Sequence, residues 1–347
     1  MKKSLIMLGS FLLSSVLSGQ AQPGTAARLF LTHYMFTAKD NVVGQVRLTT
    51  QEAIRTVVLS GKDASGFTVD KEHRLLGRSV GKDKNTGRYA LTVTATTASG
   101  QQISQSFTII EDHFIHNKVI AHRGAWKNTG APENSIAALE HAIGLRCEGS
   151  EFDVHMSADS LPVINHDASI QGISIARTPS RELLALKLTN GEPMPTLEQY
   201  IQAGLDQLNT KLILEIKASE LGKEYSLALT RKIVALVEKL QAQAWVDYIS
   251  FDYDVCLEVM RLAPYARVAY LKGDKTPAEL AADHFYGLDY HFNVLKKNPD
   301  WVTRAKQHTL TVNVWTANDK SLLEDLLQQQ VDFITTNEPE LLLSLVK

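Results

Sequence analysis

Cysteine is scarce in this chain, whose 347 residues include only Cys147 and Cys256. Two cysteines cannot form the disulfide framework that holds a small secreted domain together, and these two lack the spacing of a zinc site. We expect both side chains to be buried as small apolar residues. A disulfide between them is the alternative, since the amino terminus described below indicates an exported protein.

Excess charge of either sign is also absent. The chain has 36 lysine and arginine residues against 38 aspartate and glutamate residues, which gives a formal net charge of −2. Proteins that bind the phosphate backbone of nucleic acids usually carry a basic overall charge or a basic patch. The composition therefore gives no reason to expect a nucleic acid as partner.

Long apolar runs are absent except near the amino terminus. Lys2-Lys3 is followed by an apolar segment from Leu5 to Leu17 and then by Gly19-Gln20-Ala21. This order is typical of a secretory signal peptide. We expect residues 1–21 to be removed, which predicts a periplasmic or secreted protein without stable membrane insertion. An uncleaved anchor is the alternative, although the apolar segment is short for a membrane span.

Residues 22–112 show the alternation of apolar and polar residues that is typical of β-strands. Tyr89, Leu91 and Val93 alternate with other residues, and a second run at 103–109 follows a short polar turn. We predict a small all-β sandwich over residues 22–112. The stretch GRYALTVTATTASG resembles bacterial immunoglobulin-like or cadherin-like modules, which implies either a binding module or a spacer. Further strands are expected at 29–36, 42–48 and 56–59.

Residues 113–347 alternate between strand and helix patterns. Eight apolar runs have the length of buried strands, and the segments between them have helical spacing. This alternation predicts a TIM-type (β/α)8 barrel, so the fold class is α/β with an all-β domain in front. Functional residues of such barrels gather at the carboxyl ends of the strands. The predicted strands are 119–123, 149–154, 212–217, 247–252, 267–271, 287–291, 310–315 and 332–336.

Polar side chains follow the first two of these strands closely. His122 and Arg123 come at the end of the first strand. Glu151 and Asp153 lie two residues apart in the second strand, so both side chains leave the same face. The chain then reverses near residues 159–160, and we expect the returning segment to bring His166 to the level of the two carboxylates.

A third carboxylate and a lysine have the same spacing on the next strand. Glu215 and Lys217 lie two residues apart and should both face the barrel interior. With Glu151 and Asp153, Glu215 would form a group of oxygen ligands suited to Mg²⁺ or Ca²⁺. Without a cation these carboxylates would repel one another. For Lys217, a buried ion pair with Glu215 is the alternative to a contact with substrate.

The two histidines and the arginine suit phosphate chemistry. His122 and His166 can share acid and base roles near neutral pH, because the unperturbed pKa of histidine is about 6.5. The guanidinium of Arg123 offers paired donors to a phosphate group. The alternative for Arg123 is a buried salt bridge to a carboxylate such as Glu133.

Four further polar or aromatic residues lie near strand ends. His155 shares a face with Asp153 and is a candidate for contact with substrate. Asp289, His291 and Trp315 lie at the ends of later strands, and we include His291 and Trp315 among the candidate substrate-binding residues. The alternative for Trp315 is that it only covers the top of the barrel.

Five short motifs occur along the chain in an order that resembles the glycerophosphodiester phosphodiesterase family. They are HRG at 122–124, PENS at 132–135, EFDV at 151–154, HD at 166–167 and LEIK at 214–217. The resemblance covers residues 119–338 and departs from the family pattern at Ser135 and Ser160. It implies a TIM-type barrel, the same three metal ligands, an aromatic pocket near Trp315, and hydrolysis of glycerophosphodiesters to glycerol phosphate and an alcohol.

Other functions remain as alternatives at this stage. Within the same superfamily, a phospholipase of the sphingomyelinase D or phosphatidylinositol type would act on intact lipid. A glycosidase would use paired carboxylates but would not need two histidines and an arginine. An amidohydrolase would usually carry a His-x-His pair on the first strand, and this chain has His122-Arg123-Gly124 instead. A degenerate barrel that only binds is the alternative outside enzymes.

Overall fold

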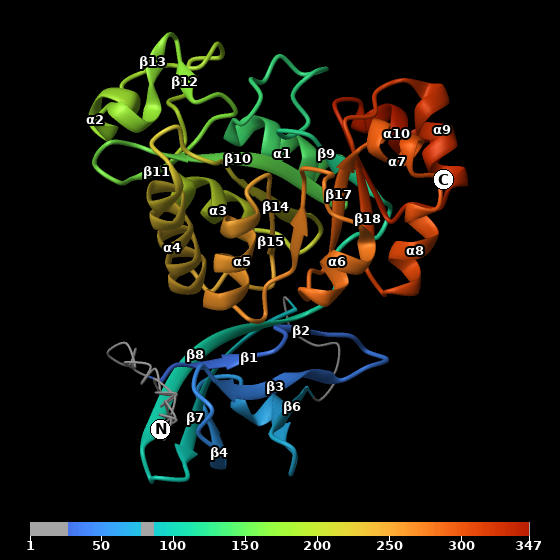
Figure 1. The fold of residues 1–347 in the computed structure, drawn as a ribbon. Helices are drawn as coiled ribbons and strands as arrows, with labels where there is room; N and C mark the ends of the chain where they lie inside the picture. The colour runs from blue at the N-terminus through green and yellow to red at the C-terminus, as the bar shows by residue number, and fades with distance from the viewer. Residues whose placement is uncertain (1–26, 78–86, 347) are drawn as a thin grey trace, which may run out of the picture.

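The computed structural model describes residues 27–77 and 87–346. The predicted signal peptide at residues 1–21 lies outside the described residues. The described chain forms β-sheets from residues 29–111 and a barrel surrounded by helices from residues 119–345 (Figure 1). Among the described residues, no helix combines the length and the apolar content needed to cross a membrane.

Two four-stranded sheets form the amino-terminal part, with the orders β1-β3-β6-β5 and β2-β8-β7-β4. The predicted hairpin is present as antiparallel β7 and β8. Aromatic rings join the two sheets, because the ring centroids of Phe36 and Phe67 lie 5.7 and 5.3 Å from that of Tyr89. The strands are β1 (Leu29–Leu31), β2 (Met35–Phe36), β3 (Val42–Leu48), β4 (Ile54–Ser60), β5 (Phe67–Val69), β6 (Arg74–Gly77), β7 (Arg88–Thr97) and β8 (Gln102–Glu111).

The prediction of one strand over residues 29–36 is wrong, because this segment forms two strands in different sheets. Between them the backbone at His33 passes so close to β3 that a Cβ on Gly44 would lie 2.6 Å from the His33 nitrogen. The chain leaves the first sheet at this contact and enters the second at Met35. Strands β5 and β6 were not predicted, since each is only three or four residues long.

Eight parallel strands close the barrel in the order β9-β10-β14-β15-β16-β17-β18-β19, and β19 pairs with β9. Their positions confirm all eight predicted runs. A further strand, β11 (Pro162–Ile164), pairs antiparallel with the extended end of β10. The barrel strands are β9 (Val119–Ala121), β10 (Gly149–Met156), β14 (Lys211–Ile216), β15 (Val246–Ser250), β16 (Val268–Tyr270), β17 (Gly287–His291), β18 (Thr311–Trp315) and β19 (Phe333–Thr336).

Helices surround the strands, and side-chain caps define several of their starts. Ser135 accepts a hydrogen bond from the Ala138 amide at the start of α1, and Thr196 and Gln199 form a capping box at the start of α3. The helices are α1 (Ile136–Gly144), α2 (Ser180–Leu183), α3 (Leu197–Leu205), α4 (Lys223–Lys239), α5 (Tyr253–Leu262), α6 (Pro277–Ala282), α7 (Phe292–Lys297), α8 (Trp301–Gln307), α9 (Lys320–Gln328) and α10 (Pro339–Leu345). Two short strands, β12 (Ser169–Ile170) and β13 (Ile173–Ser174), lie above the barrel with α2 (Figure 1).

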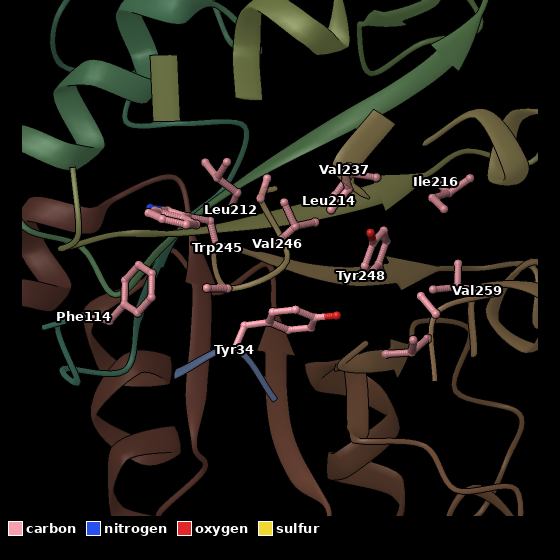
Figure 2. Close-up of a cluster of buried hydrophobic side chains, with 14 of the residues drawn as sticks. Tyr34, Phe114, Leu212, Leu214, Ile216, Val237, Trp245, Val246, Tyr248 and Val259 are labelled. Carbon is pink, nitrogen blue, oxygen red and sulfur yellow. The ribbon is translucent and has the colours of Figure 1, made fainter. Parts of the chain in front are cut away.

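The barrel strands bury apolar side chains on both faces. Leu212, Leu214 and Val246 belong to the main core, in which Figure 2 shows them beside Trp245 and Tyr248. A separate cluster of apolar residues fills the middle of the barrel interior, formed by Ile120, Ile213, Ile249 and Leu271. Both cysteines are buried and free, which confirms the expectation of burial and excludes the disulfide in this structure.

The amino-terminal sheets pack against the end of the barrel at which the strands begin. The guanidinium of Arg88 on β7 lies 4.8 Å from the ring centroid of Trp245, just before β15. The ring of Tyr34 lies 5.0 Å from that of Tyr265, and Arg28 pairs with Glu238 at 2.7 Å. The carboxyl ends of the barrel strands therefore remain free of the amino-terminal part (Figure 1).

Candidate active site

A tight turn at the end of β9 positions His122 and Arg123. Arg123 and Gly124 both have positive φ, at 57° and 79°. Helix α1 packs directly on this turn, because a Cβ at Gly124 would lie 2.7 Å from the Cβ of Ala138. Glycine is therefore required at this position. The Arg123 amide donates a 2.8 Å hydrogen bond to Glu151 Oε2, which ties the turn to the neighbouring strand β10.

Glu151, Asp153 and Glu215 converge at the carboxyl ends of β10 and β14. Asp153 pairs in register with Glu215 on the adjacent strand, and Glu151 lies two residues before Asp153 on the same face. One ligand atom from each of the three carboxylates lies within 4.8 Å of the others, and all three residues are buried. This convergence is the arrangement that the two-residue spacings predicted.

Asn134 holds Asp153 in place. Its side-chain amide donates a 2.8 Å hydrogen bond to Asp153 Oδ2, and its Oδ1 accepts one from the Asp153 amide at 3.0 Å. Asn134 has a φ of 59°, which asparagine tolerates better than most residues. The next residue, Ser135, caps α1, whereas Asn134 supports the acidic group.

Negative charge in this group is only partly compensated. Burial, together with the charges of Asp153 and Glu215, raises the pKa of Glu151 well above its ordinary range. Burial raises the pKa of Glu215 to about 7, with a further contribution from Asp153. Although burial opposes it, Lys217 lowers the pKa of Asp153, because its Nζ lies 3.0 Å from Asp153 Oδ1 and 2.8 Å from Glu215 Oε1. Three carboxylates thus share one ammonium group.

These residues fit a divalent cation. Glu151 Oε1 is buried and has no hydrogen-bond partner, so one ligand oxygen is available. Buried carboxylates that share a site either bind a cation or take up a proton. The group of Glu151, Asp153 and Glu215 could therefore hold a metal ion. The ion pairs of Lys217 with Asp153 and Glu215 match the structural alternative considered for that lysine.

His122 presents an unprotonated Nε2 to the cavity. Its Nδ1 lies 2.7 Å from Asn337 Oδ1, an oxygen that can only accept, so the ring proton lies on Nδ1. Burial, with the nearby charge of Arg123, lowers the pKa of His122 to about 4. Nε2 lies 4.0 Å from Glu151 Oε2. A neutral imidazole in this state can accept a proton near the acidic group.

The hairpin of β10 and β11 brings His166 back to the same cavity. The chain reverses at Ser160, which has a φ of 69°, as predicted from the position of this turn. His166 Nδ1 lies 2.7 Å from Asp167 Oδ1. His155 on β10 contacts the backbone of His166, because its Nε2 lies 3.1 Å from the His166 carbonyl oxygen. His155 is buried and is not among the residues that line the cavity, so the structure does not support its predicted contact with substrate.

Arg123 is held by Glu133. Its Nη1 donates to both carboxylate oxygens of Glu133 at 2.9 and 3.0 Å. Its Nε is buried without a hydrogen-bond partner and lies 3.9 Å from Asp153 Oδ2. The salt bridge considered as the alternative is therefore present, yet the side chain still lines the cavity and keeps donors for a ligand.

The cavity above the acidic group measures about 110 Å³ and has two unlike halves. Strands β9, β10 and β14 with the hairpin supply the charged half, formed by His122, Arg123, Glu151, His166, Glu215 and Lys217. The neighbouring strands β15 to β18 supply the other half, formed by Ile249, Phe251, Leu271, Asp289 and Trp315. The charged half can bind an anionic group, and the apolar half can cover the carbon atoms attached to it.

Trp315 and His291 occupy different places in the apolar half. Trp315 lines the cavity, donates from Nε1 to the Asp289 carbonyl at 2.9 Å and contacts the ring of Phe251 at a centroid distance of 5.4 Å. His291 is not among the lining residues; its Nδ1 accepts a hydrogen bond from the Asn293 amide and caps α7. The structure thus does not support the predicted contact of His291 with substrate.

A larger cavity of about 260 Å³ lies at the opposite end of the barrel interior. Residues near the beginnings of the strands line it, including Lys211, Asp247 and Arg267, together with Phe114 from the segment between the two parts. It lacks the two histidines and the acidic group. The smaller cavity is therefore the better candidate for the active site, as expected from its position at the carboxyl ends of the strands.

Sequence reasoning missed two residues that support the histidine and the acidic group. They are Asn337, which holds His122, and Asn134, which holds Asp153. Both are asparagines at positions directly after a strand or before a helix, where side-chain amides are often used to orient neighbouring groups. Phe251, which extends β15 into the cavity wall, was also not singled out.

Comparison with known proteins agrees with this geometry. The sequence profile of the glycerophosphoryl diester phosphodiesterase family matches residues 122–341. A glycerophosphodiester phosphodiesterase from Caldanaerobacter subterraneus is 26% identical over 245 residues, which cover 66% of this chain and 97% of that protein.

Solved structures give the same result. The crystal structure of a glycerophosphodiester phosphodiesterase from Parabacteroides distasonis is 44% identical with a TM-score of 0.65, and the match covers 66% of this chain and 96% of the other. An Oleispira antarctica phosphodiesterase, solved in complex with its product sn-glycerol-3-phosphate, is 26% identical with a TM-score of 0.55 and matches over 65% and 95% of the two chains.

Proposed function

Because this chain belongs to the glycerophosphoryl diester phosphodiesterase family, we propose that it is a metal-dependent phosphodiesterase that hydrolyses glycerophosphodiesters to glycerol phosphate and an alcohol. The observation that carries the proposal is the convergence of three carboxylates, two histidines and an arginine on one cavity. A diester carries one negative charge and needs both charge neutralisation and proton transfer for hydrolysis, and this set of residues supplies both.

Glu151, Asp153 and Glu215 would hold the cation, for which we propose Mg²⁺ or Ca²⁺ because all three ligands are carboxylate oxygens. When bound, such an ion neutralises charge on the phosphoryl oxygens and orients the diester. Arg123, fixed on one side by Glu133, would donate to a non-bridging oxygen of the phosphate. Lys217, through its ion pairs with Asp153 and Glu215, would neutralise part of the negative charge of the acidic group when the diester binds.

The two histidines would divide the proton transfers. His122 Nε2 is unprotonated at neutral pH and would accept the proton of the attacking hydroxyl. This hydroxyl comes either from water or from the neighbouring carbon of the glycerol group, the latter by way of a cyclic phosphate. His166, whose Nδ1–H would donate to Asp167 Oδ1, would act as the imidazolium and give its second proton, on Nε2, to the departing alkoxide.

The size of the cavity favours a small substrate over an intact lipid. A cavity of about 110 Å³ suits a phosphate with a short polyol but has no room for two acyl chains. A hydrolysis screen over glycerophosphocholine, glycerophosphoethanolamine, glycerophosphoinositol and the corresponding phospholipids tests this proposal. We expect release of glycerol phosphate from the deacylated compounds in the presence of a divalent cation. Preferential cleavage of the acylated compounds would indicate a phospholipase instead, and binding without cleavage would indicate a degenerate barrel.

We also propose that the mature protein is exported and begins after residue 21, with an amino-terminal β domain at 22–112 and the catalytic barrel at 113–347. The apolar amino terminus with its two lysines supports export. Mass spectrometry of the protein isolated from periplasm or culture medium tests this proposal, and an intact Met1 in the cytoplasmic fraction would contradict it.

A further inference from the structure

Asp289 is the one ionisable residue in the apolar half of the catalytic cavity, within the part of the chain that the structure describes. It shares this half with Ile249, Phe251, Leu271 and Trp315. Its carboxylate belongs neither to the acidic group of Glu151, Asp153 and Glu215 nor to an ion pair among the described residues. The proposed chemistry therefore leaves this residue without a role.

The environment of Asp289 is costly for a carboxylate. The residue is 2% exposed, and its Oδ1 is buried without a hydrogen-bond partner. A buried polar atom without a hydrogen-bond partner destabilises the folded state. Burial raises the pKa of Asp289 to about 8, although an interaction with the Asn313 side chain opposes the rise. A protonated carboxyl group both donates and accepts hydrogen bonds, as a hydroxyl group does.

The depth of Asp289 indicates which part of a diester it would meet. Asp289 lines the catalytic cavity and also the larger cavity at the opposite end of the barrel interior. It therefore lies at the floor of the active site and not at the mouth. A substrate that binds its phosphate on the charged half must place one ester group at the floor and the other toward solvent. In the proposed reaction the glycerol group is common to all substrates, whereas the alcohol varies. The floor of the cavity limits the size of the group that binds there, so it suits the glycerol group, whereas the variable alcohol can extend toward solvent.

From this geometry we propose that Asp289 is a specificity-determining residue that hydrogen-bonds to the terminal hydroxyl group of the glycerol moiety, the one farther from the phosphate. The ligand chemistry is a short diol attached to phosphate, with its carbon atoms against Trp315 and Leu271 and its terminal hydroxyl on Asp289 Oδ1, which has no hydrogen-bond partner among the described residues. This inference rests on the proposed function and adds to it the residue that recognises the glycerol group.

The test is a cycle with two enzymes and two substrates. The substrates are glycerophosphocholine and 2-hydroxypropyl phosphocholine, which has the same three carbon atoms and keeps the hydroxyl group next to the phosphate ester but lacks the terminal hydroxyl group. Both release choline, so one assay serves for all four values of kcat/KM. The wild-type enzyme should prefer glycerophosphocholine. In Asp289→Ala this preference should fall by about 10- to 100-fold, because the site can distinguish the two substrates only while the carboxyl group that binds the hydroxyl is present.

Two further variants make the result specific. Asp289→Asn keeps the size and one hydrogen-bonding oxygen, so it should retain more of the preference than Asp289→Ala. Asp247→Asn removes an acid that lines the larger cavity at the opposite end of the barrel and does not line the catalytic cavity, so it should leave the preference unchanged. Equal losses on both substrates in Asp289→Ala would overturn the inference, since they would indicate a general structural effect.

The remaining outcomes separate the inference from the function on which it rests. If wild-type enzyme cleaves neither diester, the proposed function itself fails. If it cleaves both with equal kcat/KM, the function stands and the recognition of glycerol by Asp289 is wrong. If Asp289→Ala slows glycerophosphoglycerol but not glycerophosphocholine, Asp289 contacts the head group, which also overturns the assignment to the glycerol moiety.

Discussion

Replacing Asp289 by asparagine should stabilise the protein, and the gain should grow with pH. The pKa of this carboxyl group rises on folding from its ordinary 3.8 to about 8, because the side chain is buried. A carboxyl group whose pKa is raised in the folded state favours folding below its unfolded pKa, and this stability is lost as the pH rises toward the folded pKa. Asparagine has nearly the same shape and does not ionise.

The size of the effect follows from the shift. Each pKa unit corresponds to about 1.4 kcal/mol, so the stability difference between variant and wild type should increase by about 1.4 kcal/mol per pH unit between about pH 4 and pH 8. Between pH 5 and pH 8 the increase is then about 4 kcal/mol, and above pH 8 it should level off. Titrating groups that do not interact with Asp289 contribute equally to both proteins and cancel in the difference, whereas the charge of Glu215, which also raises the pKa of Asp289, contributes to the measured change.

The measurement is urea unfolding of Asp289→Asn and wild type at several pH values, with a chelator present so that no cation alters the neighbouring Glu215. A difference in unfolding free energy that stays constant from pH 5 to pH 8 would refute the reasoning, because it would show that Asp289 titrates at the same pH in the folded and unfolded chains. If Asp289→Asn is more stable than wild type but has a weaker preference for glycerophosphocholine, the buried acid lowers stability and is retained for function.

Three further predictions concern catalysis, the cation and the contact between the two parts. Alanine at His122 or His166 should lower kcat by about 10² to 10⁴ with an unchanged circular dichroism spectrum, and normal turnover in either variant would exclude its role as acid or base. Chelation should abolish activity and a divalent ion should restore it in wild type but not in Glu215→Gln, whereas a chelator-resistant enzyme would exclude the metal role. Arg88→Ala should lower the free energy of unfolding by about 0.5–1 kcal/mol in thermal or urea denaturation, because it removes the contact with the Trp245 ring, and unchanged stability would show that this contact contributes nothing.

The barrel and its acidic group could be predicted from the sequence because their signals are local. A two-residue spacing on a buried strand determines that Glu151 and Asp153 share a face, and apolar runs of five or six residues mark the strands themselves. All eight strands were found for this reason. The order of the strands in a parallel barrel then brings their carboxyl ends to one side without further information.

Features that depend on residues far apart in the chain could not be predicted in the same way. The partner of His122 is Asn337, 215 residues later, and nothing in the local sequence of either residue indicates the contact. The division of residues 29–36 into two strands depends on the close approach of the His33 backbone to Gly44, which no periodicity shows. His155 and His291 lie near strand ends but do not line the catalytic cavity, because proximity to a strand end does not determine whether a side chain points into it.

The attachment of the amino-terminal sheets to one end of the barrel decides how the protein can be anchored. Strand β4, an edge strand, lies on the side of these sheets away from the barrel (Figure 1). If the protein were tethered to a solid support, a cell envelope or a fusion partner through this edge, the mouth of the catalytic cavity would point outward into the surrounding liquid. Immobilised protein should then process dissolved diesters as fast as free protein does.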